Sequence, residues 1–133
     1  AVLESLVQQT LLPQLVVVVN DASQDQTPVV VERYSKVHPF IVCLNRDAKD
    51  VHYSLGGKVV EVFHEGWAYV LNNCTLCDYI VKMDADVEFQ PTLFEKISNR
   101  IKMESVNRYT ALCGIPMETL RYTQWFVCSR WVA

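Results

Sequence analysis

Two aspartates, Asp84 and Asp86, stand one residue apart in the segment "IVKMDADVEF", directly after an apolar run. Two carboxylates this close repel each other unless a cation lies between or beside them. Mg²⁺ and Mn²⁺ prefer one or two carboxylates together with substrate phosphates, so this DxD pair predicts a metal ion bound with a phosphate-bearing ligand. On an extended strand, alternate residues point to opposite sides. Both aspartates therefore reach one ion only if the chain turns at Ala85; otherwise one holds the metal and the other a ligand hydroxyl.

Two other apolar runs also end in polar residues. Asn20 and Asp21 end "QLVVVVND", and Asn45 and Arg46 end "PFIVCLNR". In a parallel sheet the carboxyl ends of the strands meet at one edge, where ligands bind near a switch in strand order. A single aspartate at a strand end is also a common turn former or helix cap. Asp21 together with the DxD pair favours a ligand site instead.

Helices and strands alternate along the chain. Helices are expected at 1–9, 27–37, 57–73 and 91–102, and strands at 14–21, 40–45, 78–84 and 109–115. Four consecutive valines in the first strand are typical of a central strand covered on both faces. The pattern predicts an α/β fold with a Rossmann-like, mostly parallel sheet and helices on both faces. In the longest helix the expected inward stripe is Val59, Phe63, Trp67, Val70 and Leu71.

The composition is that of one globular domain. The chain has 133 residues, of which half are apolar and a fifth are charged. A net charge of -3 with no basic block argues against nucleic acid as a partner. The longest strongly apolar stretch, 15–19, is too short to cross a bilayer, and no signal peptide opens the chain. Five cysteines without a metal-site spacing indicate reduced thiols, so the expected location is the cytoplasm, or the cytoplasmic face of a membrane.

Three segments carry a family resemblance: "SLVQQTLLPQLVVVVNDASQDQT", "SLGGKVVEVFHEGW" and "CDYIVKMDADVEFQP". They resemble the nucleotide-binding half of family 2 glycosyltransferases of the GT-A type, in the family's order over residues 3–98. "NDAS.D.T" and "DAD" are the most specific marks, whereas "GGK…G" contains one extra residue. The resemblance implies a nucleotide-diphospho-sugar transferase fold and metal-dependent, inverting transfer. The sugar would move from a UDP- or GDP-sugar to a hydroxyl of a glycan, lipid or protein.

The same resemblance implies roles for particular residues. Asp21 should contact the nucleobase, and Asp84 the ribose or the metal. Asp86 should be the main protein ligand of a Mn²⁺ or Mg²⁺ that bridges the diphosphate. Lys58 should lie near the nucleotide or its phosphates, although an exposed lysine at a helix start is the alternative interpretation.

Two features of the family have no match. Its first strand, which helps to hold the base, precedes the first helix and is missing. The catalytic base is unknown, because the context of Glu118, the nearest later acid, does not fit. "QWFVCSRW" does not match QxxRW either, because Val127 stands three residues before Arg130. Residues 1–133 are therefore expected to form one nucleotide-sugar-binding domain that lacks its first strand and its C-terminal acceptor part.

Two other functions fit parts of the pattern. A phosphohydrolase of the haloacid dehalogenase type also has a DxD after a hydrophobic strand, with the first aspartate as nucleophile. Against it, Glu88 stands where that family has a threonine, and the motif comes late in the chain. The other alternative is a non-catalytic domain that binds a nucleotide. Metal-dependent binding of nucleoside diphosphates would favour the glycosyltransferase over the phosphohydrolase, which would instead hydrolyse phosphate monoesters without binding these nucleotides.

Overall fold

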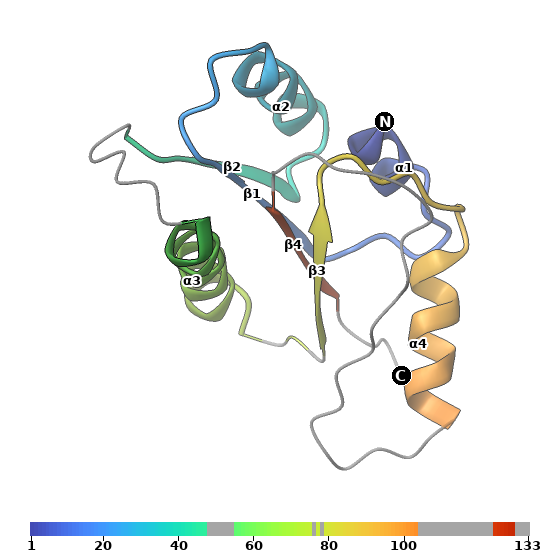
Figure 1. Cartoon of the computed structure of the whole chain (residues 1–133). Coiled ribbons are helices and arrows are strands. Elements are labelled where there is room, and N and C mark those ends of the chain that lie inside the picture. The colour runs from blue at the N-terminus through green and yellow to red at the C-terminus, as the bar shows by residue number, and fades with distance from the viewer. Residues whose placement is uncertain (48–54, 76, 78, 104–123, 130–133) are drawn as a thin grey trace.

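The computed structural model describes residues 1–47, 55–75, 77, 79–103 and 124–129 (Figure 1). Helices and strands alternate through most of this length, as the sequence predicts. In chain order they are α1 (Val2–Val7), β1 (Leu15–Asn20), α2 (Thr27–Val37), β2 (Ile41–Asn45), α3 (Leu55–Asn73), β3 (Tyr79–Asp84), α4 (Leu93–Met103) and β4 (Gln124–Ser129).

The four strands form one sheet in the order β2-β1-β4-β3. Strands β1 and β2 pair in parallel, whereas β4 pairs antiparallel with both β1 and β3. Consequently β1, β2 and β3 all run in the same direction, and the predicted α/β fold with a mostly parallel sheet is confirmed. The sequence did not predict β4, and the strand expected at 109–115 lies outside the described residues.

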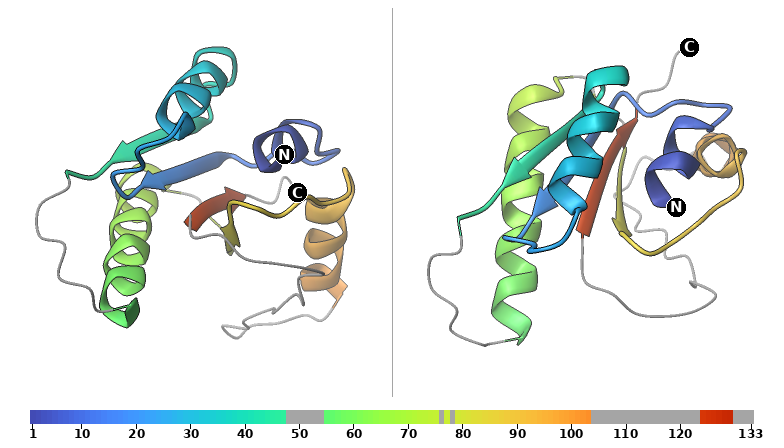
Figure 2. Two further views of the ribbon diagram at one scale, coloured as in Figure 1. Left: turned by 45° about the horizontal axis from the view of Figure 1, so that its top comes forward. Right: turned by 90° about the horizontal axis from the view of Figure 1, so that it is seen from above.

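Strand β1 is buried on both faces by the alternation of its side chains. Val16 and Val18 pack with residues of α1, α2 and α4, whereas Val17 and Val19 pack with residues of α3. All four valines are at most 1% exposed. Figure 2 shows α3 on one side of the sheet and the other helices on the opposite side. The valine run is therefore a central strand between two hydrophobic layers, as predicted.

Helix α3 buries the predicted face only in part: Val70 is buried as predicted, whereas Trp67 and Leu71 are not. The buried positions are spaced four apart, at Val62, Gly66 and Val70. Gly66 has no side chain, so the helix backbone can lie close to the sheet at this turn. Two bulky side chains of the helix lie on its exposed side instead: Trp67 is 39% and Leu71 60% exposed. The prediction that Trp67 belongs to the core is therefore wrong.

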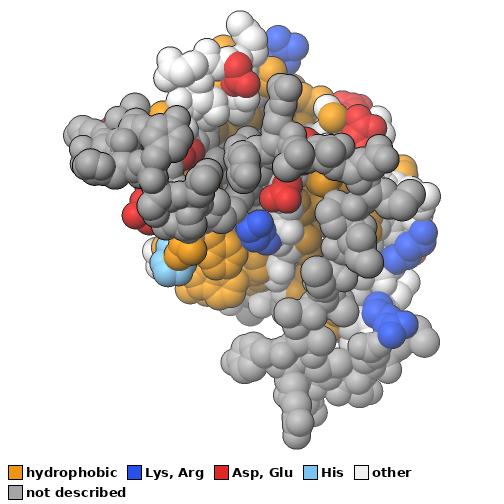
Figure 3. All heavy atoms as spheres, viewed as in Figure 1, with side chains coloured by type: hydrophobic (Ala, Val, Ile, Leu, Met, Phe, Trp, Pro, Cys, Tyr) orange, Lys and Arg blue, Asp and Glu red, His pale blue; other side chains and the backbone are white. Residues whose placement is uncertain are grey.

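Hydrophobic side chains consequently gather on the surface of α3, beside a histidine (Figure 3). Phe63 and Trp67 stack there, with ring centroids 5.9 Å apart and an interplanar angle of 23°. Phe63 also packs against the buried layer beneath α3, so its ring belongs partly to the core. The stack thus extends the hydrophobic layer outward along one side of the helix.

The structure bears on two predictions: that the cysteines are reduced, and that no segment crosses a membrane. Cys43 and Cys74 are free thiols, but Cys77 is in a disulfide, so the prediction of reduced thiols is wrong for Cys77. Within the described parts of the chain, no helix combines the length and the apolar character that crossing a bilayer requires.

Candidate functional site

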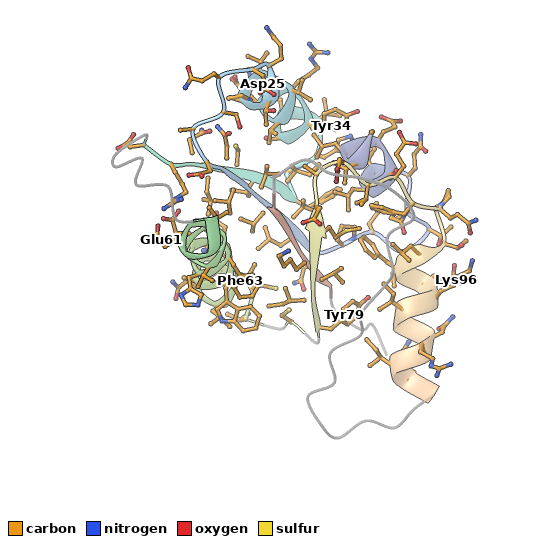
Figure 4. All side chains as sticks on the ribbon, in the orientation of Figure 1. Asp25, Tyr34, Glu61, Phe63, Tyr79 and Lys96 are labelled. Atoms are coloured by element: carbon orange, nitrogen blue, oxygen red, sulfur yellow. The ribbon has the colours of Figure 1, made fainter. Side chains whose placement is uncertain are left out.

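The carboxyl ends of β1, β2 and β3 meet at one edge of the sheet. Asn20 lies opposite Asn45, and Gln124, the first residue of β4, lies opposite both Val19 and Asp84. One strand therefore separates the ends of β1 and β3, which places them about 10 Å apart. Tyr79, at the start of β3, marks the opposite edge (Figure 4). The strand ends thus converge as predicted, with a spacing that suits an elongated ligand.

Side-chain hydrogen bonds order the loop that follows β1. Asn20, only 3% exposed, donates its Nδ2 proton to Asn45 Oδ1 at 2.9 Å and accepts from the backbone N–H of Ser23 at 3.2 Å. Between them Ala22 has a φ of 52°, in the left-handed region. Residues without glycine's freedom adopt this conformation at a cost, and such positions gather at functional sites. Asp21 is therefore presented by a turn that the surrounding structure holds in place.

The strain at Ala22 can be measured by replacing it with glycine. We expect Ala22→Gly to raise the free energy of unfolding by about 0.5 kcal/mol, because relief of the left-handed penalty exceeds the entropy that glycine adds to the unfolded chain. Urea denaturation measures the change. The matched control is Ala68→Gly on the exposed face of α3, which should lower the same free energy by about 1 kcal/mol. Equal destabilisation by both glycines would show that Ala22 is not strained.

Arg46 joins the ends of β1 and β2 to α3. Its Nη1 donates to Asp21 Oδ1 at 2.8 Å, its Nε to Glu65 Oε1 at 3.0 Å, and its Nη2 to Glu61 Oε2 at 3.4 Å. Glu61 lies at the end of α3 that approaches the strand ends (Figure 4). Burial alone would lower the pKa of Arg46, but the carboxylates of Glu65, Asp21 and Glu61 raise it above its ordinary value. The guanidinium is thus a fixed positive charge beside Asp21.

The two aspartates of the DxD pair lie in different environments. Strand β3 ends at Asp84, and the chain turns at Ala85 and Asp86, which meets the condition for both carboxylates to approach one ion. The Asp84 side chain is 56% exposed and lies 3.5 Å from Lys82 Nζ. In contrast, Oδ2 of Asp86 is buried and has no hydrogen-bond partner among the described residues. A buried carboxylate oxygen without a partner is costly, and a bound cation is one of the few things that explain it.

Alternate apolar residues anchor the chain beside Asp86. Ala85, Val87 and Phe89 pack against the hydrophobic layer that contains α1 and α4. The Phe89 ring contacts that of Phe94, with centroids 5.7 Å apart. These contacts hold the backbone on both sides of Asp86 against the hydrophobic layer.

Gln9 ties this segment to α1 and was not predicted. Its side chain is 5% exposed in total; Nε2 donates to the carbonyls of Ser5 and Gln90, both at 2.9 Å, and Oε1 accepts from the N–H of Phe94 at 3.1 Å. Ser5 Oγ also accepts from the N–H of Phe89 at 3.3 Å. The position of Gln9, three residues after the buried Leu6, is the one sequence signal that could have identified it.

Two residues named in the sequence analysis remain, Lys58 and Glu118. Lys58 lies in the first turns of α3, one turn before Glu61, so its backbone is near the ends of β1 and β2. Its predicted contact with phosphate stays a prediction. Glu118 lies outside the described residues.

A divalent ion fits the DxD turn by the chemistry of its donors. Among the described residues, no three His, Cys, Asp or Glu side chains form a metal-binding group. Mg²⁺ and Mn²⁺ do not require such a cage, because one or two carboxylates suffice when substrate phosphates supply further oxygens. Asp86, with its unpartnered buried oxygen, and the exposed Asp84 provide these carboxylates.

Comparison with known proteins gives one match. A model of the family described as glycosyl transferase family 2 matches residues 1–119. This range contains Asp21, Arg46, Lys58, Asp84 and Asp86, but not β4. Searches of the curated proteins and of the solved structures found no match.

Proposed function

Because the chain belongs to glycosyl transferase family 2, we propose that it transfers a sugar from a nucleotide-diphosphate donor to a hydroxyl acceptor. The family has the GT-A type, Rossmann-like fold, with which the sheet and its two helical layers agree. The observation that carries the proposal is the buried Oδ2 of Asp86, which has no partner among the described residues and lies in the turn after Asp84.

The proposed donor lies along the edge formed by the strand ends. Its base is at Asp21, where Arg46 supports the carboxylate, and its diphosphate is at Asp86 and Asp84. The ends of β1 and β3 lie about 10 Å apart. This separation supports the assignment, because the base and the diphosphate lie at opposite ends of the nucleoside diphosphate and need different partners. Lys58 is proposed to contribute positive charge near the phosphates.

Asp86 and Asp84 would hold a Mn²⁺ or Mg²⁺ ion together with the donor diphosphate. When bound, the ion supplies positive charge that stabilises the diphosphate as it leaves. In the proposed reaction an acceptor hydroxyl attacks the anomeric carbon, the bond from that carbon to the diphosphate oxygen breaks, and the configuration inverts. The hydroxyl proton passes to a general base, a role that we assign to none of the described residues.

The family match bears on the other candidate functions. It gives no support to a phosphohydrolase of the haloacid dehalogenase type, in which Asp84 would be a nucleophile. A non-catalytic domain that only binds the nucleotide uses the same site, so the binding test applies to it equally. We further propose a glycan, lipid or protein acceptor. The disulfide of Cys77 removes the argument from reduced thiols for a cytoplasmic location.

Titration with UDP and GDP, with and without Mn²⁺, tests the proposal by calorimetry. We expect at least one nucleotide to bind, and chelation of the metal to weaken binding by about tenfold or more, because the ion links the diphosphate to Asp86. Incubation with UDP- and GDP-sugars, followed by measurement of released nucleotide, then separates an enzyme from a binding domain. Hydrolysis of phosphate monoesters without any nucleotide binding would contradict the proposal.

A further inference from the structure

Arg46 connects the proposed base end of the site with α3 through ion pairs to Asp21, Glu61 and Glu65. Its side chain is 18% exposed, and Nη1, Nε and Nη2 each donate to a different carboxylate. A guanidinium is planar and its donors have fixed directions, so three partners determine its orientation. A lysine ammonium, on a flexible stem, has no such fixed fork.

The backbone of Arg46 adds a second connection to the end of β1. Its N–H donates to the carbonyl of Asn20 at 3.0 Å, one residue before Asp21. Arg46 therefore contacts both the backbone next to Asp21 and the carboxylate of Asp21. This arrangement fixes Asp21 more closely than a single ion pair would.

Exposure distinguishes the three carboxylates that surround the guanidinium. The side chains of Glu61 and Glu65 are 67% and 47% exposed, so water also solvates them, whereas that of Asp21 is 34% exposed. Asp21 is thus the least exposed of the three carboxylates, and its bond to Arg46 is also the shortest. The two glutamates hold the guanidinium from the α3 side.

We propose that Arg46 is a positioning residue of the donor site. It directs the Asp21 carboxylate toward the nucleobase, and Glu61 and Glu65 on α3 keep it in place. The inference rests on the proposed function, because it requires Asp21 to contact the base. It assigns no contact between Arg46 itself and the donor.

The test compares a ligand that has a base with one that has none. In Arg46→Met, which keeps the length but removes the charge and the donors, the Kd for UDP or GDP with Mn²⁺ should rise by about tenfold or more, the size of effect typical of a lost positioning partner. The Kd for Mn²⁺-pyrophosphate should change by less than about twofold, because the DxD turn lies one strand away. Arg46→Lys should fall between wild type and Arg46→Met. Arg33→Met, at an exposed arginine on α2, is the matched control and should bind like wild type.

A double variant separates positioning from a change of charge. In Arg46→Met/Glu65→Gln the local charge is the same as in wild type, yet we expect nucleotide binding to stay weak, because the guanidinium that directs the Asp21 carboxylate is still missing. Recovery to the wild-type Kd would overturn the inference, as would equal weakening of pyrophosphate or unchanged nucleotide binding in Arg46→Met. If wild type itself binds pyrophosphate but no nucleotide, the proposed function fails together with this inference. If wild type binds nucleotide but the variants do not behave as expected, only the inference about Arg46 fails.

Discussion

Replacement of Asp86 by asparagine is expected to abolish metal-dependent nucleotide binding while making the metal-free protein more stable. A neutral amide is a poor ligand for a hard cation, so the affinity for Mn²⁺ with UDP or GDP should fall by more than about 100-fold. In the absence of metal the same change removes a negative charge from a buried oxygen without a partner among the described residues. The free energy of unfolding should therefore rise by about 1 kcal/mol.

Calorimetry measures the first effect, and denaturation in the presence of a chelator measures the second. Glu88→Gln is the matched control, because it makes the same change of charge at an exposed side chain two residues further on. It should alter neither quantity beyond about 0.5 kcal/mol. A metal-free Asp86→Asn protein that is less stable than wild type would mean that the carboxylate serves the fold, and metal binding would need another ligand.

Replacement of Gln9 by methionine is expected to lower the free energy of unfolding by about 2–4 kcal/mol. Methionine has a similar length but cannot replace the three hydrogen bonds to Ser5, Gln90 and Phe94. Each buried group that loses its partner costs about 1–3 kcal/mol, and Gln9 is 5% exposed. The affinity for Mn²⁺ and nucleotide should fall as well, because the segment after Asp86 keeps only the Ser5–Phe89 hydrogen bond to α1 and loses those of Gln9.

Gln8→Met provides the control for this prediction. Gln8 lies beside Gln9 in the chain, but its side chain is exposed and its hydrogen bond goes to Glu4 within the same helix region. That change should cost less than about 0.5 kcal/mol by urea denaturation. Similar losses in the two variants would show that the bonds of Gln9 contribute no more than an exposed pair.

Features that depend on local pattern were predictable from the sequence. The four valines of β1 could only be a strand buried on both faces, and the polar residues after each apolar run identified the edge where Asn20, Asn45 and Asp84 meet. These predictions need only the alternation of side chains and the parallel direction of the strands.

Features that depend on how elements are rotated against one another were not predictable. The face that α3 buries was predicted only in part, because the prediction counted apolar side chains, whereas the buried positions include Gly66, which has no side chain, and leave Trp67 exposed. The contacts of Arg46 with Glu61 and Glu65 follow from the same rotation. The hydrogen bonds of Gln9 to Gln90 and Phe94 could not be foreseen because these partners lie on a segment more than eighty residues away.

That separation has a consequence for the order in which the protein folds. The bonds from Gln9 and Ser5 to residues 89–94 join positions 81 to 85 residues apart, so they close a very long loop. Such closure costs chain entropy that is regained only when both segments pack. During synthesis β1, α2 and β2 can assemble before the turn that carries Asp86 has any support. The metal ion proposed at Asp86 would therefore find its ligand only in chains that have nearly finished folding, and its binding would favour the completed fold over partly folded ones.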